Sequence, residues 1–310
     1  MTDKQSDRMK GVLAPVLTPF DAEGKPDPVR LERICRWLIS HDCGLAIFGT
    51  NSEGNSLSVP ERMDLLDHLV AAGLPVHRMM PGTGSCSLPE AVSLTRAVVD
   101  HGCGGALVLP PFYYKIATDD GLFAFFSELI EGVGDERLRI YLYHIPPVTQ
   151  VGFSHSLVER LLKRYPGVIA GMKDSGGDWA YTEKTLSLFA SSGFDVFCGT
   201  ETILLDTMRR GGRGCISATC NVNPGAIVKL YDTWQADDAP QQQEALNVIR
   251  SSFAAFPMIA AMKDAVSVAL GDPGWTRLRP PLQELNNEER TSLRCRLGEL
   301  SFDLTGISPA

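Results

Sequence analysis

Eight short apolar runs alternate with longer amphipathic segments over the first 220 residues of the chain. The apolar runs are residues 12–17, 45–48, 76–80, 106–109, 140–143, 168–172, 196–198 and 215–217. The segments with helical character between them are residues 29–40, 60–72, 89–100, 119–132, 154–164, 178–190 and 202–210. Continuous apolar runs of this length are typical of strands buried on both faces, so the pattern predicts a parallel sheet covered by helices.

Eight such strand–helix units in about 220 residues favour a closed (β/α)8 barrel, the TIM barrel, over an open doubly wound sheet. No Gly-x-Gly-x-x-Gly follows the first run, which argues against a dinucleotide-binding fold. After Pro224 the strand pattern stops and only helical patterns follow. We therefore expect an α/β chain with a catalytic barrel over residues 1–222 and a C-terminal helical domain over residues 223–310.

The charge and cysteine content restrict the partners of the chain. A formal net charge of −8 argues against bulk electrostatic binding of nucleic acid or of an anionic membrane. No apolar run approaches the ~18 residues that span a bilayer, and the polar segment Met1–Lys10 lacks the apolar core of a secretory signal. The eight cysteines show no zinc-ligand spacing, so we expect buried free thiols in a reducing, cytoplasmic compartment.

Lys173 is the charged residue that ends the apolar run 168–172. A lysine after a strand is more often a solvated end or an ion-pair partner than a reactive group. An ammonium at the end of a buried strand is nevertheless costly to desolvate unless it is paired or reacts as the neutral amine. Lysine is also the side chain that forms Schiff bases with carbonyl substrates.

Catalytic residues of such barrels lie at the carboxyl ends of the strands. Hydroxyl groups, tyrosines and one lysine follow the predicted strands, and no metal-ligand set does. His144 stands alone there, so a hydrogen-bonded structural histidine is the better interpretation. Lys263 falls in the helical tail, where we expect a solvated face. The strand-end segments are 49–53, 82–84, 110–114, 143–146, 173, 199–201 and 216–217.

A lone amine among hydroxyls predicts class I chemistry on a 2-oxo acid. The amine would form a carbinolamine and then an iminium, which accepts electrons when a bond at C3 breaks or forms. Because each step moves protons, a nearby phenol is useful. Neutral donors of a Gly-Thr loop could bind the substrate carboxylate. No metal or organic cofactor is expected, since the Schiff base itself is the electron sink.

Five short motifs occur in order along the chain: Gly49-Thr50-Asn51-Ser52-Glu53, Tyr143-His144-Ile145-Pro146, Gly171-Met172-Lys173-Asp174-Ser175, Gly214-Cys215-Ile216-Ser217 and Arg279-Pro280-Pro281-Leu282. These motifs resemble those of the dihydrodipicolinate synthase / N-acetylneuraminate lyase family, over about residues 10 to 300. The resemblance implies a barrel with a helical C-terminal domain and a homotetramer built from two tight dimers.

The resemblance implies a role for each matched residue. Lys173 would be the Schiff-base lysine and Tyr143 the phenol that moves protons. Thr50 would link Tyr143 to Tyr113, which in the synthases comes from the neighbouring subunit. Thr50 and Asn51 would hold the pyruvate carboxylate. The Ile216 carbonyl would face the site.

Departures from the family motifs bear on the substrate. The synthases carry an arginine two residues after the proline of the Tyr-Asn-x-Pro motif, where it grips the aldehyde substrate's carboxylate. Here that position is Val148, which cannot supply a carboxylate clamp. The loop Gly199-Thr200-Glu201 could instead hydrogen-bond a polyhydroxy tail.

Three functions remain open at this point. The first is a Schiff-base lyase, aldolase or dehydratase of a 2-keto-3-deoxy sugar acid or a related 2-oxo acid, with pyruvate as product or co-substrate. The second is dihydrodipicolinate synthase, which condenses pyruvate with aspartate semialdehyde. The third is a non-catalytic binding protein for a small 2-oxo acid on the same barrel.

Overall fold

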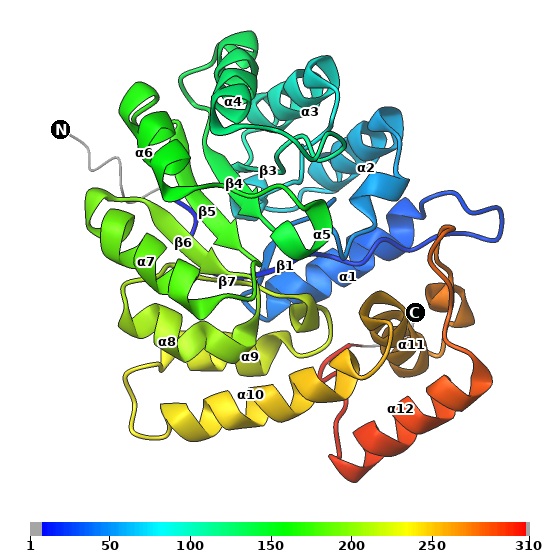
Figure 1. Ribbon diagram of the computed structural model, residues 1–310. Coiled ribbons are helices and arrows are strands. Elements are labelled where there is room, and N and C mark those ends of the chain that lie inside the picture. The colour runs from blue at the N-terminus through cyan, green and yellow to red at the C-terminus, as the bar shows by residue number, and fades with distance from the viewer. Residues whose placement is uncertain (1–7, 308–310) are drawn as a thin grey trace. The chain divides into compact units, whose positions relative to one another are not determined.

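The computed structural model describes residues 8–307 (Figure 1). Residues 1–7 of the polar N-terminal segment lie outside the described residues. The described chain falls into two compact units. One comprises the chain up to Gly11 together with Pro75–Ile216, and the other comprises Val12–Leu74 together with the chain from Ser217 onward. Each unit is described below by itself.

The first unit contains a parallel run of strands in the order β7-β6-β5-β4-β3. Figure 1 shows β4, β5 and β6 side by side. All residues of these five strands are buried, as expected for strands covered on both faces. The strands are β3 (Ala106–Val108), β4 (Ile140–His144), β5 (Ile169–Asp174), β6 (Asp195–Cys198) and β7 (Gly214–Ile216).

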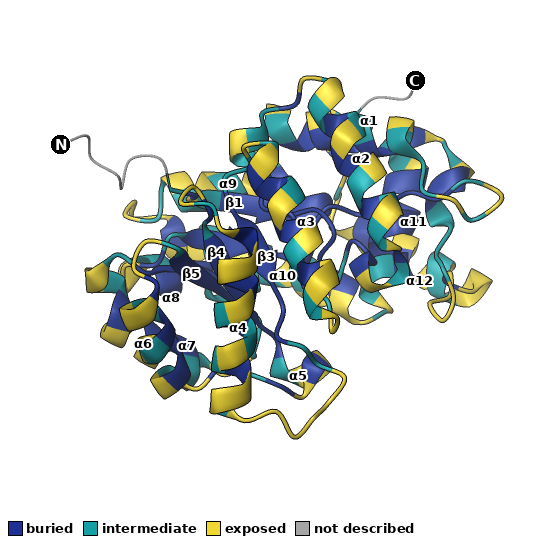
Figure 2. Cartoon of the chain, turned by 90° about the horizontal axis from the view of Figure 1, so that it is seen from above, coloured by how far each residue is buried: buried dark blue, intermediate teal, exposed yellow. Residues whose placement is uncertain are grey.

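The helices of the first unit follow its strands in alternation. Figure 2 shows buried and exposed faces alternating along α4 and α7, as amphipathic helices on a sheet require. Side-chain caps fix several of their starts: Thr118 accepts from the Gly121 amide and Ser154 from the Leu157 amide. The helices are α3 (Leu88–Asp100), α4 (Asp119–Val133), α5 (Pro146–Thr149), α6 (His155–Arg164), α7 (Trp179–Phe189) and α8 (Leu204–Arg209).

The second unit combines a short strand pair with most of the remaining helices. Strand β1 (Gly11–Ala14), which begins in the first unit, pairs in parallel with β2 (Gly44–Leu45), Leu13 standing opposite Gly44. Ser58 and Glu61 form the reciprocal capping box that the sequence predicts for α2. The helices are α1 (Pro28–Ser40), α2 (Val59–Ala71), α9 (Pro224–Asp232), α10 (Ala239–Ala254), α11 (Met258–Leu270) and α12 (Asn287–Glu299).

The predicted strand at residues 76–80 is wrong. Val76–Arg78 form a 3₁₀ helix, so the described residues contain seven strands in place of the predicted eight. Parallel pairing appears a few residues later, where Gly82 bridges Leu107. The Leu107 amide donates to the Pro81 carbonyl at 2.9 Å. Because Pro81 has no N–H to donate, pairing here is confined to isolated bridge residues.

The remaining expectations on organisation fare differently. Beyond Pro224 the described residues form helices joined by turns and irregular segments, without a strand. The domain boundary after residue 222 stays a prediction.

All eight cysteines lie in the described residues and are free, although Cys86 and Cys295 are exposed rather than buried. Within residues 8–307, no single helix has the length and apolarity to cross a bilayer; the pair α10 and α11, bent by 103°, passes that test by length and composition only.

Candidate active site

Lys173 and Tyr143 lie opposite each other on the adjacent parallel strands β5 and β4. The Lys173 Nζ donates a hydrogen bond to the Tyr143 hydroxyl at 3.1 Å and lies 4.2 Å from the centre of the Tyr143 ring. Both residues are only 2% exposed. The sequence produces this pair because each residue is the penultimate one of its strand, so that the register aligns them. A buried amine and a buried phenol are therefore in direct hydrogen-bonding contact.

His144 and Asp174, one residue further along each strand, take the opposite orientation that strand alternation dictates. The His144 Nδ1 accepts a hydrogen bond from the Phe153 amide at 3.1 Å, and its ring stacks on Tyr181 with 4.2 Å between centres. Burial lowers the pKa of His144 to about 4, since the imidazolium would lose its hydration. These contacts match a structural histidine and provide no base.

Asp174 is equally tied into the structure. Its two carboxylate oxygens accept from the Gly176 amide at 2.8 Å and from the Thr182 hydroxyl at 2.6 Å. Burial raises the pKa of Asp174, and these hydrogen bonds oppose that rise. With both oxygens occupied, Asp174 fixes the start of the loop after β5.

Backbone hydrogen bonds join the loops that leave β4, β5 and β6. The Ser175 amide donates to the His144 carbonyl at 2.7 Å, and the Gly199 amide donates to the Asp174 carbonyl at 2.6 Å. At Gly199 an added Cβ would lie 2.0 Å from the Ser175 hydroxyl, so a side chain there would displace the loop. Gly199 thus permits the close approach of two loops.

The residues next to Gly199 that the sequence analysis selected differ in exposure. Thr200 is half-buried and its hydroxyl lies 3.0 Å from the Thr202 hydroxyl, whereas Glu201 is only 1% exposed. Ile216, the last residue of β7, is fully buried. Thr200 is therefore the more accessible polar group of this loop.

Tyr113 and Val148 are both largely exposed, at 72% and 60%. Tyr113 packs edge-on against Tyr114 in the loop after β3, while Val148 lies on the short helix α5. Lys115 links the two segments, because its Nζ donates to the Phe112 carbonyl at 2.7 Å and the Thr149 carbonyl at 2.9 Å. The sequence analysis missed Lys115, since no motif or spacing distinguishes a single lysine in a polar loop.

Thr50 and Asn51 belong to a tight turn of the second unit and are half-buried. The turn lies between Phe48 and Glu53, whose φ angles of 63° and 54° place both in the left-handed region. The Glu53 amide donates to the Thr50 carbonyl at 3.1 Å. The backbone of this turn thus has a defined conformation, and it carries the Thr50 and Asn51 side chains.

The expectation of a solvated Lys263 is wrong. Lys263 on α11 is fully buried, and its Nζ donates to the Glu53 carboxylate and, at 2.8 Å, to the Arg277 carbonyl. Burial lowers the pKa of Lys263, and Glu53 counters part of that effect. Sequence periodicity could not find this pair because Glu53 lies 210 residues away along the chain.

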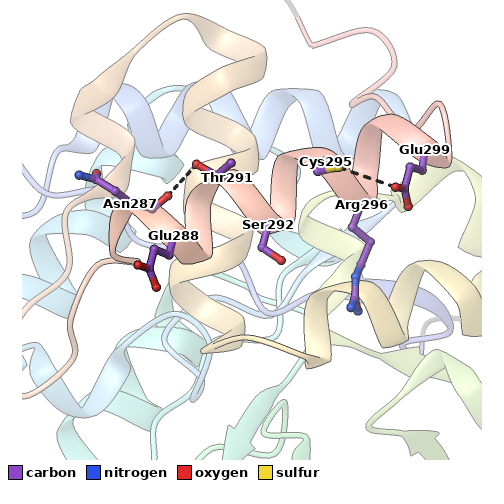
Figure 3. A pocket seen from close by; sticks show the side chains of 7 residues that line it. All are labelled: Asn287, Glu288, Thr291, Ser292, Cys295, Arg296 and Glu299. Carbon is purple, nitrogen blue, oxygen red and sulfur yellow. Dashed lines mark hydrogen bonds between the residues drawn. The ribbon is translucent and has the colours of Figure 1, made fainter.

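A hollow of about 660 Å³ lies along α12, but it contains no residue of the sequence-predicted site (Figure 3). Its lining comes from that one helix: Asn287, Glu288, Thr291, Ser292, Cys295, Arg296 and Glu299. Among the described residues, no three or more His, Cys, Asp or Glu side chains are grouped so that they could hold a metal ion.

Comparisons with known proteins identify the family of the chain. Residues 8–300 match the model of the dihydrodipicolinate synthetase family. A DapA-like lyase of Chloroflexus aurantiacus is 31% identical over 92% of this chain and 95% of its own length. YagE of Escherichia coli, named as a candidate 2-dehydro-3-deoxy-D-gluconate aldolase, is 28% identical over 96% of this chain and 99% of its own.

Solved structures show the same likeness. Dihydrodipicolinate synthase from Agrobacterium tumefaciens superposes with a TM-score of 0.86 at 31% identity, covering 94% of this chain and 99% of that one. YagE in complex with pyruvate gives a TM-score of 0.85 at 27% identity, covering 95% and 99%. With the parallel sheet and its alternating helices, this likeness shows the TIM-barrel fold. The chain is a lyase that belongs to the dihydrodipicolinate synthetase family.

Proposed function

We propose that this lyase acts through Lys173 on a 2-keto-3-deoxy sugar acid or a related 2-oxo acid, with pyruvate as product or co-substrate. The observation that carries the proposal is the buried contact between the Lys173 Nζ and the Tyr143 hydroxyl at 3.1 Å. The amine is the nucleophile that Schiff-base chemistry requires, and the phenol is a proton carrier within its reach. YagE, a relative crystallised with pyruvate, supports a 2-oxo acid as the ligand.

In the proposed reaction the neutral Lys173 amine attacks the C2 carbonyl and forms a carbinolamine. Tyr143 delivers a proton to the carbinolamine hydroxyl, which leaves as water, and the iminium forms. Tyr143, left as the phenolate, then takes the proton of the C4 hydroxyl as the C3–C4 bond breaks. The electron pair of that bond moves through C3 onto the iminium nitrogen, and the aldehyde leaves. Protonation of the enamine at C3 and hydrolysis of the iminium then release pyruvate and the free amine. In the dehydratase variant, loss of a C3 proton from the same iminium would give an enamine that expels the C4 hydroxyl as water once that hydroxyl is protonated.

The other groups of the proposed site rest on motif resemblance. Thr50 and Asn51 would hold the substrate carboxylate with neutral donors, and the Ile216 carbonyl would face the bound acid. Tyr113, exposed in this chain, would act across a subunit boundary in a homotetramer built as a dimer of dimers. The loop Gly199-Thr200-Glu201 would contact the distal hydroxyls of the substrate.

Val148 favours this proposal over dihydrodipicolinate synthesis. An exposed valine on α5 offers no donor to a second carboxylate, and aspartate semialdehyde needs one. The synthase alternative is supported by the name of the Agrobacterium relative. The third possibility, a non-catalytic binding protein, agrees poorly with a family of lyases and with the presence of both Lys173 and Tyr143.

Borohydride trapping tests the proposal. Incubation with pyruvate and borohydride should add one reduced pyruvate per chain, located on Lys173 by peptide mass spectrometry. Lys173→Ala should abolish the adduct, and Lys184→Ala, which removes an exposed lysine of α7, should not. A panel of 2-keto-3-deoxy acids and aspartate semialdehyde, followed by product analysis, then separates the substrates. Absence of a wild-type adduct, or a Lys173→Ala enzyme that turns over normally, would refute the proposal.

A further inference from the structure

We propose that the buried Glu53–Lys263 ion pair is a positioning device for carboxylate recognition, holding the turn that carries Thr50 and Asn51. The inference rests on the proposed function, in which that turn binds the substrate carboxylate. Glu53 and Lys263 are positioning residues, because neither is proposed to touch the substrate. All residues of this argument belong to the second unit.

The backbone of the turn is held in a conformation that its sequence does not favour. Phe48 and Glu53, at its two ends, both have positive φ, which costs of order 1 kcal/mol or more for residues with a side chain. Gly54 allows the closure: an added Cβ would lie 2.0 Å from the Phe48 carbonyl oxygen. The Gly54 amide also donates to the Gly49 carbonyl at 3.0 Å. Contacts from outside the turn must therefore keep Glu53 in place.

The Glu53 side chain receives such contacts at both of its oxygens. Oε1 accepts from the Lys263 Nζ, and Oε2 accepts from the Arg279 amide at 3.1 Å. Lys263 is itself fixed by the Arg277 carbonyl and by the Phe20 ring, whose centre lies 4.7 Å from its Nζ. The side chains of both Glu53 and Lys263 are 0% exposed. The Glu53 carboxylate is thus held by protein groups and is shielded from solvent.

The Arg279 guanidinium fixes the segment that follows the turn. It donates to the Ser56 carbonyl at 2.7 Å and to the Glu61 carboxylate at 2.9 Å, and its centre lies 5.0 Å from the Phe20 ring. The turn is consequently held from α11 and from the segment 277–279, both far away along the sequence. Residues near the C-terminus thereby determine the geometry of a loop near the N-terminus.

Stability alone gives a poor account of this pair. A buried ion pair gains little over apolar residues of the same size, because the desolvation cost offsets the attraction. What the pair does supply is a fixed direction for the Glu53 side chain, and therefore a fixed turn. Replacing both Glu53 and Lys263 by neutral residues should leave the fold largely intact but loosen the turn. The effect of the pair on positioning can then be measured apart from its effect on stability.

The test compares pyruvate with methyl pyruvate, which has the same ketone but no free carboxylate. The variant is the neutral double substitution Glu53→Gln/Lys263→Met, and borohydride trapping is followed over a range of each ligand. We expect the half-saturating pyruvate concentration to rise about tenfold, because a change of this size corresponds to the loss of one charge-assisted hydrogen bond to the pyruvate carboxylate. The limiting trapping rate with pyruvate and the half-saturating concentration of methyl pyruvate should both stay within about twofold of wild type.

A matched control disturbs a neighbouring ion pair that does not touch the turn. Asp264 on α11 is 1% exposed and accepts from the Arg294 guanidinium at 2.9 Å. Asp264→Asn/Arg294→Met should lower the melting temperature and leave the half-saturating pyruvate concentration unchanged. If the first double variant does not fold, Lys263→Arg takes its place, since it keeps the charge but moves the hydrogen-bond donors. We expect this substitution also to raise the half-saturating pyruvate concentration.

Three outcomes are decisive. A folded double variant with wild-type pyruvate saturation overturns the inference, and so does an equal loss for pyruvate and methyl pyruvate. A wild-type enzyme that forms no pyruvate adduct refutes the proposed function instead, so the two failures are distinguishable. A selective loss for pyruvate that the Asp264–Arg294 control does not share supports the positioning role.

Discussion

The Lys173 amine donates a 3.1 Å hydrogen bond to the Tyr143 hydroxyl across two neighbouring parallel strands, both side chains being buried. A phenol in this position can pass a proton to or from the nitrogen without the help of solvent. It also holds the lysine in one direction, since the amine lies against the same ring. The amine and the phenol therefore form one structural unit, which in the proposed function would supply the nucleophile and the proton carrier.

Tyr143→Phe separates the two parts of that unit. The ring that packs against Lys173 is kept, but the group that protonates the carbinolamine is lost, so we expect turnover to fall about 100-fold or more. Pyruvate trapping on Lys173 should become slow without disappearing. Steady-state rates and the time course of borohydride trapping measure the two effects. Tyr114→Phe, at an exposed tyrosine, should change neither, and a Tyr143→Phe enzyme of normal rate would exclude a proton-transfer role.

Val148→Arg should shift substrate preference toward aspartate semialdehyde. Val148 is 60% exposed on α5, so a longer side chain fits there without repacking the core. A guanidinium can bind a carboxylate through two parallel hydrogen bonds, and we expect kcat/KM for aspartate semialdehyde to rise at least about tenfold. Val148→Gln, of similar length but neutral, is the control. Equal values for all three enzymes would show that Val148 does not face the distal part of the substrate.

His144 should make the protein less stable as the pH falls. Its pKa is about 4 in the folded protein because it is buried, against an ordinary value of 6.5, so the unfolded chain binds the proton first. Stability is then complete above pH 6.5 and declines toward pH 4, by roughly 3 kcal/mol in total. Burial also lowers the pKa of His155, which stacks on Tyr181 and adds to the same trend.

His144→Asn tests this account by removing the titrating group. Urea unfolding between pH 7.5 and pH 5 should show a shallower decline for the variant than for wild type, together with a lower stability at pH 7.5 from the lost stacking on Tyr181. His77→Asn, at an exposed histidine, should follow the wild-type curve. A variant whose curve runs parallel to wild type would contradict the assignment.

Glu61 should contribute to stability in a more acidic range. The Arg279 guanidinium, with the Ser58 backbone and hydroxyl, lowers the pKa of Glu61 to about 2 from 4.5. Its contribution is therefore present above pH 4.5 and is lost as the pH falls toward 2, roughly 2 kcal/mol after allowance for its partial exposure. Glu61→Gln should flatten the unfolding free energy between pH 5 and pH 3. Glu288→Gln, at an exposed glutamate of α12, serves as reference, and no difference between the two would remove Glu61 from this role.

Much of the barrel is readable from the sequence because its strands are uniformly apolar and locally bounded. Residues 140–143 and 168–172 mark β4 and β5 closely, and the position of Lys173 at a strand end follows from them. Residues 76–80 look similar but fold otherwise: a strand needs a partner along its length, and pairing around Pro81 is confined to isolated bridge residues.

Long-range partners are what the sequence conceals. Lys263 has the local surroundings of a helix-surface lysine, and only the folded chain brings Glu53 to it. Lys115 similarly joins the carbonyls of Phe112 and Thr149 through contacts that no periodicity encodes. His144 was interpreted correctly because an isolated histidine without neighbouring ligands is more often structural.

The Ser175 amide donates to the His144 carbonyl, and the Gly199 amide donates to the Asp174 carbonyl. These two bonds separate changes in the loops from changes in the strand residues. They fix the points from which the loops depart, so the loops can vary without moving the amine or the phenol. In the proposed function, substitutions at Thr200 or Val148 would alter which molecule is accepted, while the bond-breaking chemistry would stay with the strands. One set of strands can in this way serve a succession of substrates.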